Sequence, residues 1–181
     1  MLTTSNNNKN HITIIMSVTK VFLGVLFIAV STRVKIPWYP VPFTMQTFAV
    51  MLLGLSLGNT MKEAFGISIS YVIAGCLGLP VFANSPLGFL YLMSPTGGYL
   101  IGFVITIPLI SYIHNRLNIG LGKSLLVGVL SIFIPGVIVM SYHFGLKVAI
   151  MSGVVPFIIP EIMKISMISL IYKTSTKMGK F

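Results

Sequence analysis

The chain has 181 residues, of which 55% are hydrophobic and 8% are charged, and its mean hydropathy is +0.98. Soluble domains carry about 25% charged residues, so this composition excludes a water-soluble fold and indicates an integral membrane protein. The formal net charge of +10 does not indicate nucleic-acid binding, because the basic residues are spread singly between apolar blocks and form no patch.

The chain divides into three parts. Residues 1–11 are polar and are expected to form a disordered tail, residues 12–174 a membrane domain, and residues 175–181 a basic cytoplasmic tail. The first apolar block lacks an Ala-x-Ala cleavage site and is longer than a signal-peptide core, so it is expected to remain as the first span. The predicted fold is an all-α integral membrane protein with six transmembrane helices and irregular proline-rich outer loops. The apolar blocks that predict these helices are residues 12–31, 43–58, 63–79, 97–114, 123–142 and 158–173.

Three segments are expected to be irregular. Residues 36–42 contain three prolines, which an ordinary helix does not tolerate. Residues 79–95 and 147–160 also contain several prolines and glycines. Non-helical backbone at membrane depth is tolerated only where protein or a cavity covers it. If the amino terminus is cytoplasmic, all three segments fall on the outer side, where we expect them to form a binding site.

The distribution of basic residues supports this orientation in the cytoplasmic (inner) membrane. An excess of Lys and Arg marks the cytoplasmic side of a membrane protein. Arg33 and Lys35 fall on the outer side and are interpreted as interfacial residues that extend toward water. Both termini are therefore expected to be cytoplasmic. The basic residues on the inner side are Lys9, Lys62, Arg116, Lys123, Lys173, Lys177 and Lys180.

One of the two acidic residues, Glu161, lies in an apolar stretch and is followed three residues later by Lys164. Residues at this spacing share a helix face. Pro160 suits the first turn of a helix, so Glu161 meets the positive end of the helix dipole. A carboxylate there accepts N–H donors, as from a urea or amide, and the lysine supplies a charge for a ligand carboxylate. The alternative is a structural ion pair, although a buried pair rarely improves stability over apolar packing.

Four further polar residues are candidate ligand-binding positions beside helix breaks. The amide of Asn84 matches a ring that carries N–H and C=O side by side, although an Asn before Ser-Pro more often forms a turn. Thr44 and Gln46 follow the first proline segment, and Tyr99 follows Gly97-Gly98. Backbone groups freed at such breaks also meet ligands. The two glycines are expected to permit close helix packing.

Signals for enzymatic activity are missing. The sequence has no Gly-x-x-x-x-Gly-Lys-Ser/Thr phosphate loop, so ATP hydrolysis by that route is excluded. The three histidines lack zinc-ligand spacing, and the single Cys76 excludes an internal disulfide. We expect no enzymatic activity, no metal site and no cofactor.

Four segments, in this order and spacing, carry a resemblance to a known family: residues 40–47, 78–83, 95–103 and 155–164. Together they cover the motifs of the BioY family, the biotin-specific substrate-binding (S) components of energy-coupling factor (ECF) vitamin transporters, which the chain resembles over most of residues 20–173. The resemblance implies six membrane helices and high-affinity binding of biotin near the outer face. It places Glu161 and Asn84 toward the ureido ring and Lys164 toward the valerate carboxylate. The implied partners are the lipid bilayer, a transmembrane coupling subunit and two ATPase subunits, with biotin as transported substrate.

The sequence departs from the family pattern at two places. The family usually has Gly-Asp before the lysine, where this chain has Pro160-Glu161, so the carboxylate is one methylene further from the backbone. The family also tends to carry Ala-x-x-x-Ala on the first helix, where the nearest forms here begin at Gly24 and Val25. Two alternatives stay open: an S component for another vitamin, and a small non-transporting membrane scaffold.

Overall fold

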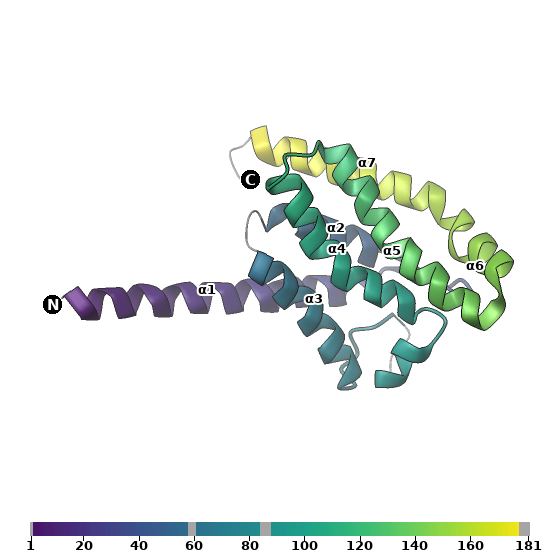
Figure 1. Ribbon diagram of the computed structural model, residues 1–181, viewed down its shortest axis with the longest axis horizontal. Helices are drawn as coiled ribbons and strands as arrows, with labels where there is room; N and C mark the ends of the chain where they lie inside the picture. Colours follow the sequence, from purple (N-terminus) through teal and green to yellow (C-terminus); the bar gives the residue numbers. More distant parts are fainter. Residues whose placement is uncertain (1, 58–60, 84–87, 178–181) are drawn as a thin grey trace.

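The computed structural model describes residues 2–57, 61–83 and 88–177, with side chains from His11 onward. Helices make up nearly all of it, and they lie side by side with α4, α5 and α7 running roughly along the long axis (Figure 1). The elements in chain order are α1 (Leu2–Ser31), β1 (Lys35–Ile36), β2 (Phe43–Thr44), α2 (Gln46–Ser56), α3 (Met61–Cys76), the 3₁₀ helix η1 (Gly88–Met93), α4 (Gly97–Asn115), α5 (Leu121–Phe144), α6 (Leu146–Gly153), the 3₁₀ helix η2 (Val155–Phe157) and α7 (Ile158–Lys177).

Four helical segments in the described residues are long and apolar enough to cross a membrane. The helix α2 has 11 residues and α3 has 16, fewer than the roughly 20 that an untilted span requires. The structure therefore establishes an all-helical fold with four candidate spans. These spans are His11–Ser31, Gly97–Asn115, Leu121–Phe144 and Leu146–Lys177.

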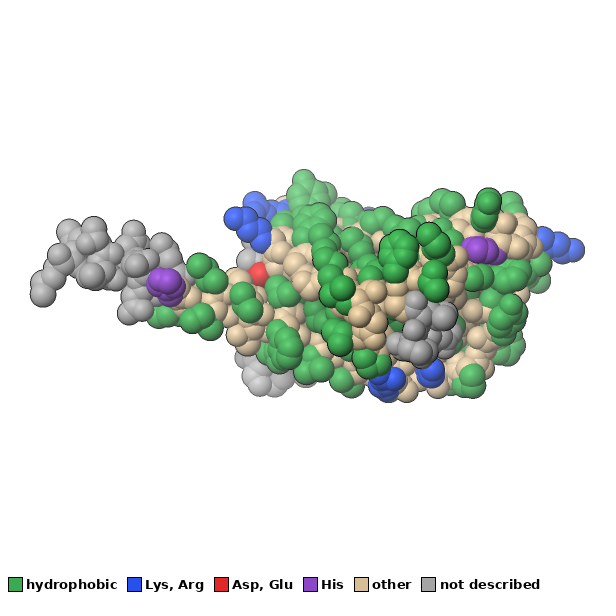
Figure 2. All heavy atoms as spheres, turned by 90° about the horizontal axis from the view of Figure 1, so that it is seen from below, with side chains coloured by type: hydrophobic (Ala, Val, Ile, Leu, Met, Phe, Trp, Pro, Cys, Tyr) green, Lys and Arg blue, Asp and Glu red, His purple; other side chains and the backbone are tan. Residues whose placement is uncertain are grey.

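The surface of the molecule matches this interpretation. Figure 2 shows hydrophobic side chains over most of the visible face, with Lys and Arg toward its margins. Large apolar residues such as Phe22, Ile138 and Leu170 are more than half exposed. In water such a surface would be an aggregation hazard, whereas in a bilayer it faces lipid.

The amino-terminal part of α1 extends beyond the rest of the helices (Figure 1). The helix includes residues 2–11, where the sequence predicts a disordered tail. Extending an existing helix adds one hydrogen bond for each residue fixed, so the polar residues 2–11 extend the helix of the apolar block that follows them. The end of α7 lies on the side of the helix bundle from which the start of α1 projects (Figure 1).

The helices α4 and α5 pack closely because glycines of α4 face α5. A Cβ atom added at Gly102 would lie 2.6 Å from the Cα of Ile132, and one at Gly98 would overlap the carbonyl oxygen of Pro135. Neither obstacle is a flexible side chain, so only glycine fits. The prediction of close packing at Gly98 is confirmed. Ile107 of α4 and Ile132 of α5 are fully buried in the same hydrophobic cluster.

The segments expected to be irregular meet at the end of the molecule opposite the termini. Residues 37–42 are non-helical and join β1 to β2 in a short antiparallel hairpin that contains a cis peptide bond before Pro40. The hairpin contacts both other segments. Its Phe43 stacks on Phe157 of η2 with ring centroids 4.4 Å apart, and Lys35 donates a hydrogen bond to the carbonyl of Ala83 at 2.6 Å.

The segment 147–160 is more helical than predicted. Most of it belongs to α6, to η2 and to the first turn of α7. Gly145, with a φ of 81°, separates α5 from α6, and Pro156 and Pro160 fall in first turns, where the missing N–H costs nothing. The prolines and glycines therefore break the chain between short helices and do not create one long loop.

Candidate functional site

Glu161 and Lys164 form a buried ion pair on the first turns of α7. The Nζ atom of Lys164 lies 2.7 Å from Oε1 of Glu161. Both residues are buried, with Lys164 7% exposed and Glu161 3% exposed. The helix starts at Ile158, after the break at η2, so Glu161 lies near its amino terminus. The helix dipole stabilises a carboxylate at that position. The predicted pairing across one turn is therefore confirmed.

Thr47 links the two charged residues and was not among the predicted site residues. Its hydroxyl donates to Oε1 of Glu161 at 2.7 Å and accepts from Nζ of Lys164 at 2.7 Å. Thr47 lies in the first turn of α2, one turn after Thr44. The sequence signals are its polar character at the helix start and its place at the end of segment 40–47, but neither indicates its partners, which lie more than 110 residues away in the chain.

The second carboxylate oxygen of Glu161, Oε2, is buried without a hydrogen-bond partner among the described residues. Its neighbour Oε1 takes both bonds, from Thr47 and Lys164. A buried, unpaired carboxylate oxygen costs free energy unless a donor reaches it. This atom is therefore an acceptor available to the N–H group of a ligand.

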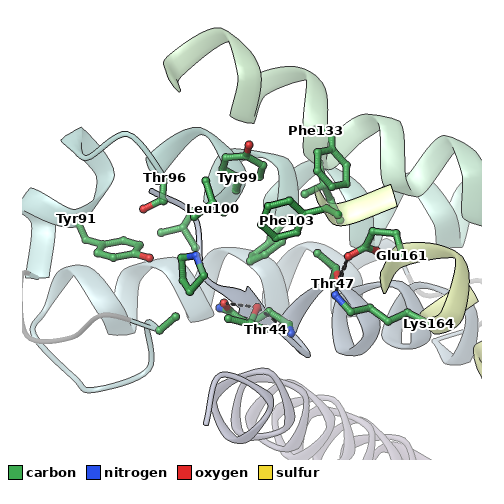
Figure 3. Close-up of a pocket in the computed structure, with 16 residues that line it drawn as sticks. Thr44, Thr47, Tyr91, Thr96, Tyr99, Leu100, Phe103, Phe133, Glu161 and Lys164 are labelled. Atoms are coloured by element: carbon green, nitrogen blue, oxygen red, sulfur yellow. Dashed lines mark hydrogen bonds and ion pairs between the residues drawn. The ribbon is translucent and has the colours of Figure 1, made fainter. Parts of the chain in front are cut away.

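The ion pair lies at one end of a cavity that is partly open to solvent. In Figure 3, Thr47, Glu161 and Lys164 lie at one end, Tyr91 and Thr96 at the other, and apolar side chains between them. A cavity of mixed polarity with a few polar groups is typical of a small-molecule site. The apolar lining consists of Val41, Pro42, Ala83, Leu100, Phe103, Ile132, Phe133 and Phe157.

Thr44 and Gln46 line the cavity as predicted, but their side chains already bond within the protein. The Thr44 hydroxyl donates to Oε1 of Gln46 at 3.1 Å, and Nε2 of Gln46 donates to the hydroxyl of Tyr71 at 2.6 Å. Tyr71 in turn donates to the carbonyl of Val81 at 2.9 Å. This chain of hydrogen bonds joins the hairpin, α2, α3 and the segment after α3. The sequence did not indicate Tyr71, which lies in the interior of α3.

Tyr99 lines the cavity with its ring only. Its hydroxyl points away from the cavity (Figure 3) and donates to the carbonyl of Gly153 at 2.9 Å. A Cβ atom at Gly153 would lie 2.5 Å from that hydroxyl, so glycine makes the bond possible. Tyr99 therefore supplies an apolar face to the cavity and ties α4 to the end of α6.

The opposite polar end of the cavity is formed by Tyr91 of η1 and Thr96. Burial raises the pKa of Tyr91 above its ordinary value, and a hydrogen bond with Thr96 opposes part of that rise. The hydroxyl of Tyr91 therefore stays protonated at neutral pH and acts as a donor. Asn84, the remaining predicted residue, lies outside the described residues, although the adjacent Ala83 lines the cavity.

The other acidic residue, Glu63, lies outside the cavity. It is 5% exposed and accepts hydrogen bonds from Ser17 at 2.8 Å and from Lys20 at 3.2 Å, both on α1. The two carboxylates of the chain are thus separate, and each has its own lysine. Among the described residues, His, Cys, Asp and Glu form no group of three that would suit a metal ion.

Comparisons with known proteins agree with one another. A model of the BioY family matches residues 4–180. A protein of Pyrococcus horikoshii called "Probable biotin transporter BioY" is 37% identical over 156 residues, which cover 82% of this chain and 91% of that one. "Biotin transporter BioY" of Thermotoga maritima is 36% identical over 148 residues, covering 80% and 86%.

The fold is also similar to a solved structure. That structure is described as "Crystal structure at 2.1 A of the S-component for biotin from an ECF-type ABC transporter". The TM-score is 0.77, and the match covers 95% of this chain and 94% of the other at 24% sequence identity. At this identity the likeness supports the arrangement of the helices alone.

Proposed function

Because the chain belongs to the BioY family, we propose that it binds biotin and serves as the substrate-binding subunit of an ECF-type transporter in the cytoplasmic membrane. The observation that carries this proposal is the free Oε2 of Glu161 at the end of a partly apolar cavity, next to Lys164. Similar proteins from Pyrococcus horikoshii and Thermotoga maritima bear the name of biotin transporters, which supports the choice of ligand.

The chemistry of biotin suits the groups in the cavity. The ureido ring offers N–H donors, one of which would reach Oε2 of Glu161, and Asn84 is proposed to bind the same ring. A lysine ammonium has three donors, and two of those of Lys164 go to Thr47 and Glu161. The third remains for the carboxylate of biotin. The sulfur-containing ring and the alkyl chain would pack on the aromatic side chains Phe103 and Phe133.

We propose six membrane crossings, made by α1, α2, α3, α4, α5 and the α6–α7 segment. Because the start of α1 and the end of α7 lie on one side of the bundle, the number of crossings is even, so α2 and α3 either both cross or both do not (Figure 1). The helix α3, with 16 residues, is about 24 Å long, roughly 6 Å shorter than the hydrocarbon core, a mismatch that local thinning of the bilayer accommodates. The basic residues gather on the side of the termini, which would then be cytoplasmic.

Uptake against a gradient requires energy. This chain has no phosphate loop with which to hydrolyse ATP, so the energy must come from a partner. We therefore propose a transmembrane coupling subunit and two ATPase subunits as partners. The protein would bind biotin from outside and release it inward without chemical change, so it would not act as an enzyme.

The test is equilibrium binding of radiolabelled biotin to the purified full chain in detergent, followed by competition. We expect dethiobiotin to displace biotin, because it keeps the ureido ring and the carboxylate chain, whereas thiamine and riboflavin should not. Displacement by thiamine or riboflavin would indicate an S component for another vitamin. Absence of any binding would favour the scaffold alternative.

Thr47→Val is expected to weaken biotin binding about tenfold. Valine keeps the branched shape but removes the hydroxyl that bonds both Glu161 and Lys164, so the ion pair loses its link to α2. Thr47→Ser keeps the hydroxyl and should bind within about threefold of the unchanged protein. Isothermal titration of the two variants measures the difference, and equal losses in both would mean that the hydroxyl is not the important group.

A further inference from the structure

The backbone carbonyls of residues 80–83, just after α3, are held by side chains from elsewhere in the chain. Arg33 donates from Nη2 to the carbonyl of Pro80, Tyr71 donates to that of Val81 at 2.9 Å, and Lys35 donates from Nζ to that of Ala83 at 2.6 Å. Two of these three donors are cations at the start of the hairpin.

Residues 80–83 form turns and bends and no helix, so helical hydrogen bonds do not define their conformation. Near the membrane interface, carbonyls without partners are costly, and bonds from side chains remove that cost. The sequence interpretation of Arg33 and Lys35 as interfacial residues accounts for a position near water. It does not account for a bond from each of them to a carbonyl more than 40 residues away in the chain.

The segment and the hairpin form adjoining walls of the cavity. Ala83 of the segment lines it, as do Val41 and Pro42 of the hairpin. The position of Ala83 is fixed further by its neighbour Phe82, which is 2% exposed and stacks on Tyr91 with ring centroids 5.0 Å apart. Arg33 and Lys35 do not line the cavity themselves.

We propose that Arg33 and Lys35 are positioning residues for ligand binding. By donating to the carbonyls of Pro80 and Ala83, they join the hairpin to residues 80–83. These two walls of the cavity are then fixed relative to each other when the ligand is bound. Loss of these bonds loosens the walls and speeds release of the ligand. The proposal rests on the proposed function for the identity of the ligand, but the bonds themselves exist without one.

The experiment compares Arg33→Met/Lys35→Met, Lys35→Met, Lys35→Arg and the unchanged full chain in detergent. Lys147→Met is the matched control, because Lys147 is an exposed cation next to the start of α6, near the same end of the molecule. The first measurement is hydrogen exchange of the backbone amides of residues 79 and 81–83 in the absence of ligand, since Pro80 has no amide hydrogen. The second is the dissociation rate of biotin after dilution into unlabelled biotin.

We expect faster exchange in residues 79–83 and a dissociation rate about tenfold higher for the double variant. Lys35→Met alone should show a smaller increase, and Lys35→Arg, which keeps a cationic donor, should restore the original rates. Lys147→Met should change neither measurement. The alternative is that Arg33 and Lys35 only attract the ligand by their charge. In that case their loss lowers the association rate of biotin and leaves its dissociation rate unchanged. That result would overturn the proposal.

The two measurements separate this proposal from the proposed function. If the unchanged protein does not bind biotin, the proposed function fails, and the exchange measurement still tests the positioning role. If exchange in residues 79–83 is the same in Lys35→Met as in the unchanged chain, the positioning role is overturned whatever the ligand. Should the double variant fail to fold, the positioning role is tested by comparing the exchange and dissociation rates of Lys35→Met with those of Lys35→Arg.

Discussion

Glu161→Gln is expected to weaken biotin binding about a hundredfold, which corresponds to about 2.7 kcal/mol. Both oxygens of this side chain are needed as acceptors: Oε1 accepts from Thr47 and Lys164, and Oε2, which has no partner among the described residues, is proposed to accept from a ligand N–H. A glutamine amide has one acceptor and one donor end. In one orientation its NH₂ group meets the ligand N–H, and in the other it meets the ammonium of Lys164. Isothermal titration with biotin measures the loss.

The matched control is Glu63→Gln, the same substitution at the other acidic residue. Glu63 is buried to a similar degree and is paired with Lys20, but it lies outside the cavity. Removing the charge from either buried pair should lower thermal stability. Only Glu161→Gln should reduce the affinity for biotin. An equal loss of affinity in both variants would attribute the effect to general destabilisation and contradict the assigned role of Glu161.

The family pattern has aspartate where this chain has Glu161, and the longer side chain is used in the structure. Its carboxylate reaches Thr47 across the interface between α2 and α7 while it also bonds Lys164 one turn away. The longer side chain thus joins two helices at the cavity. A ligand that approaches Oε2 meets a carboxylate whose other oxygen is already held, so little side-chain entropy remains to be lost on binding.

The sequence contains enough information to find the charged pair because its geometry is local. Residues three apart on a helix share a face whatever the rest of the fold does, so Glu161 and Lys164 were predictable together. The break before α7 was also local, since Pro156 and Pro160 mark it. Helix lengths were less predictable: α2 ends at Ser56 and has only 11 residues.

Other parts of the site depend on contacts between distant segments. Thr47 owes its role to residues on α7, and Lys35 bonds a carbonyl after α3. Nothing in the neighbouring sequence indicates these partners. The hydroxyl of Tyr99 illustrates the converse: its position beside a helix break suggested a ligand contact, but it bonds the carbonyl of Gly153. Periodicity and motif spacing identify which face a side chain occupies, and the packing of helices decides what it meets there.

Lys164→Met is expected to weaken biotin binding about a hundredfold and to leave the binding of biotin methyl ester nearly unchanged, because the hydroxyl of Thr47 still holds Oε1 of Glu161. Methionine is unbranched like lysine and removes the ammonium. The charge has two partners in the ligand-free protein, Glu161 and Thr47, and its third donor is proposed to bind the ligand carboxylate. The ester lacks a charged carboxylate, so it should bind the unchanged protein more weakly than biotin does. Titration of both compounds against both proteins measures the four affinities.

The ester also reports whether the cavity of the variant is intact, because it would occupy the same site. A variant that binds the ester normally but biotin weakly has lost the charge interaction and nothing else. Lys20→Met removes the lysine of the other ion pair and should alter neither affinity, since Glu63 and Lys20 lie away from the cavity. If Lys164→Met instead loses both ligands equally, the lysine acts by holding Glu161 in place, and the carboxylate of biotin must bind elsewhere. The polar end formed by Tyr91 and Thr96 is then the place where the cavity offers hydroxyl donors for it.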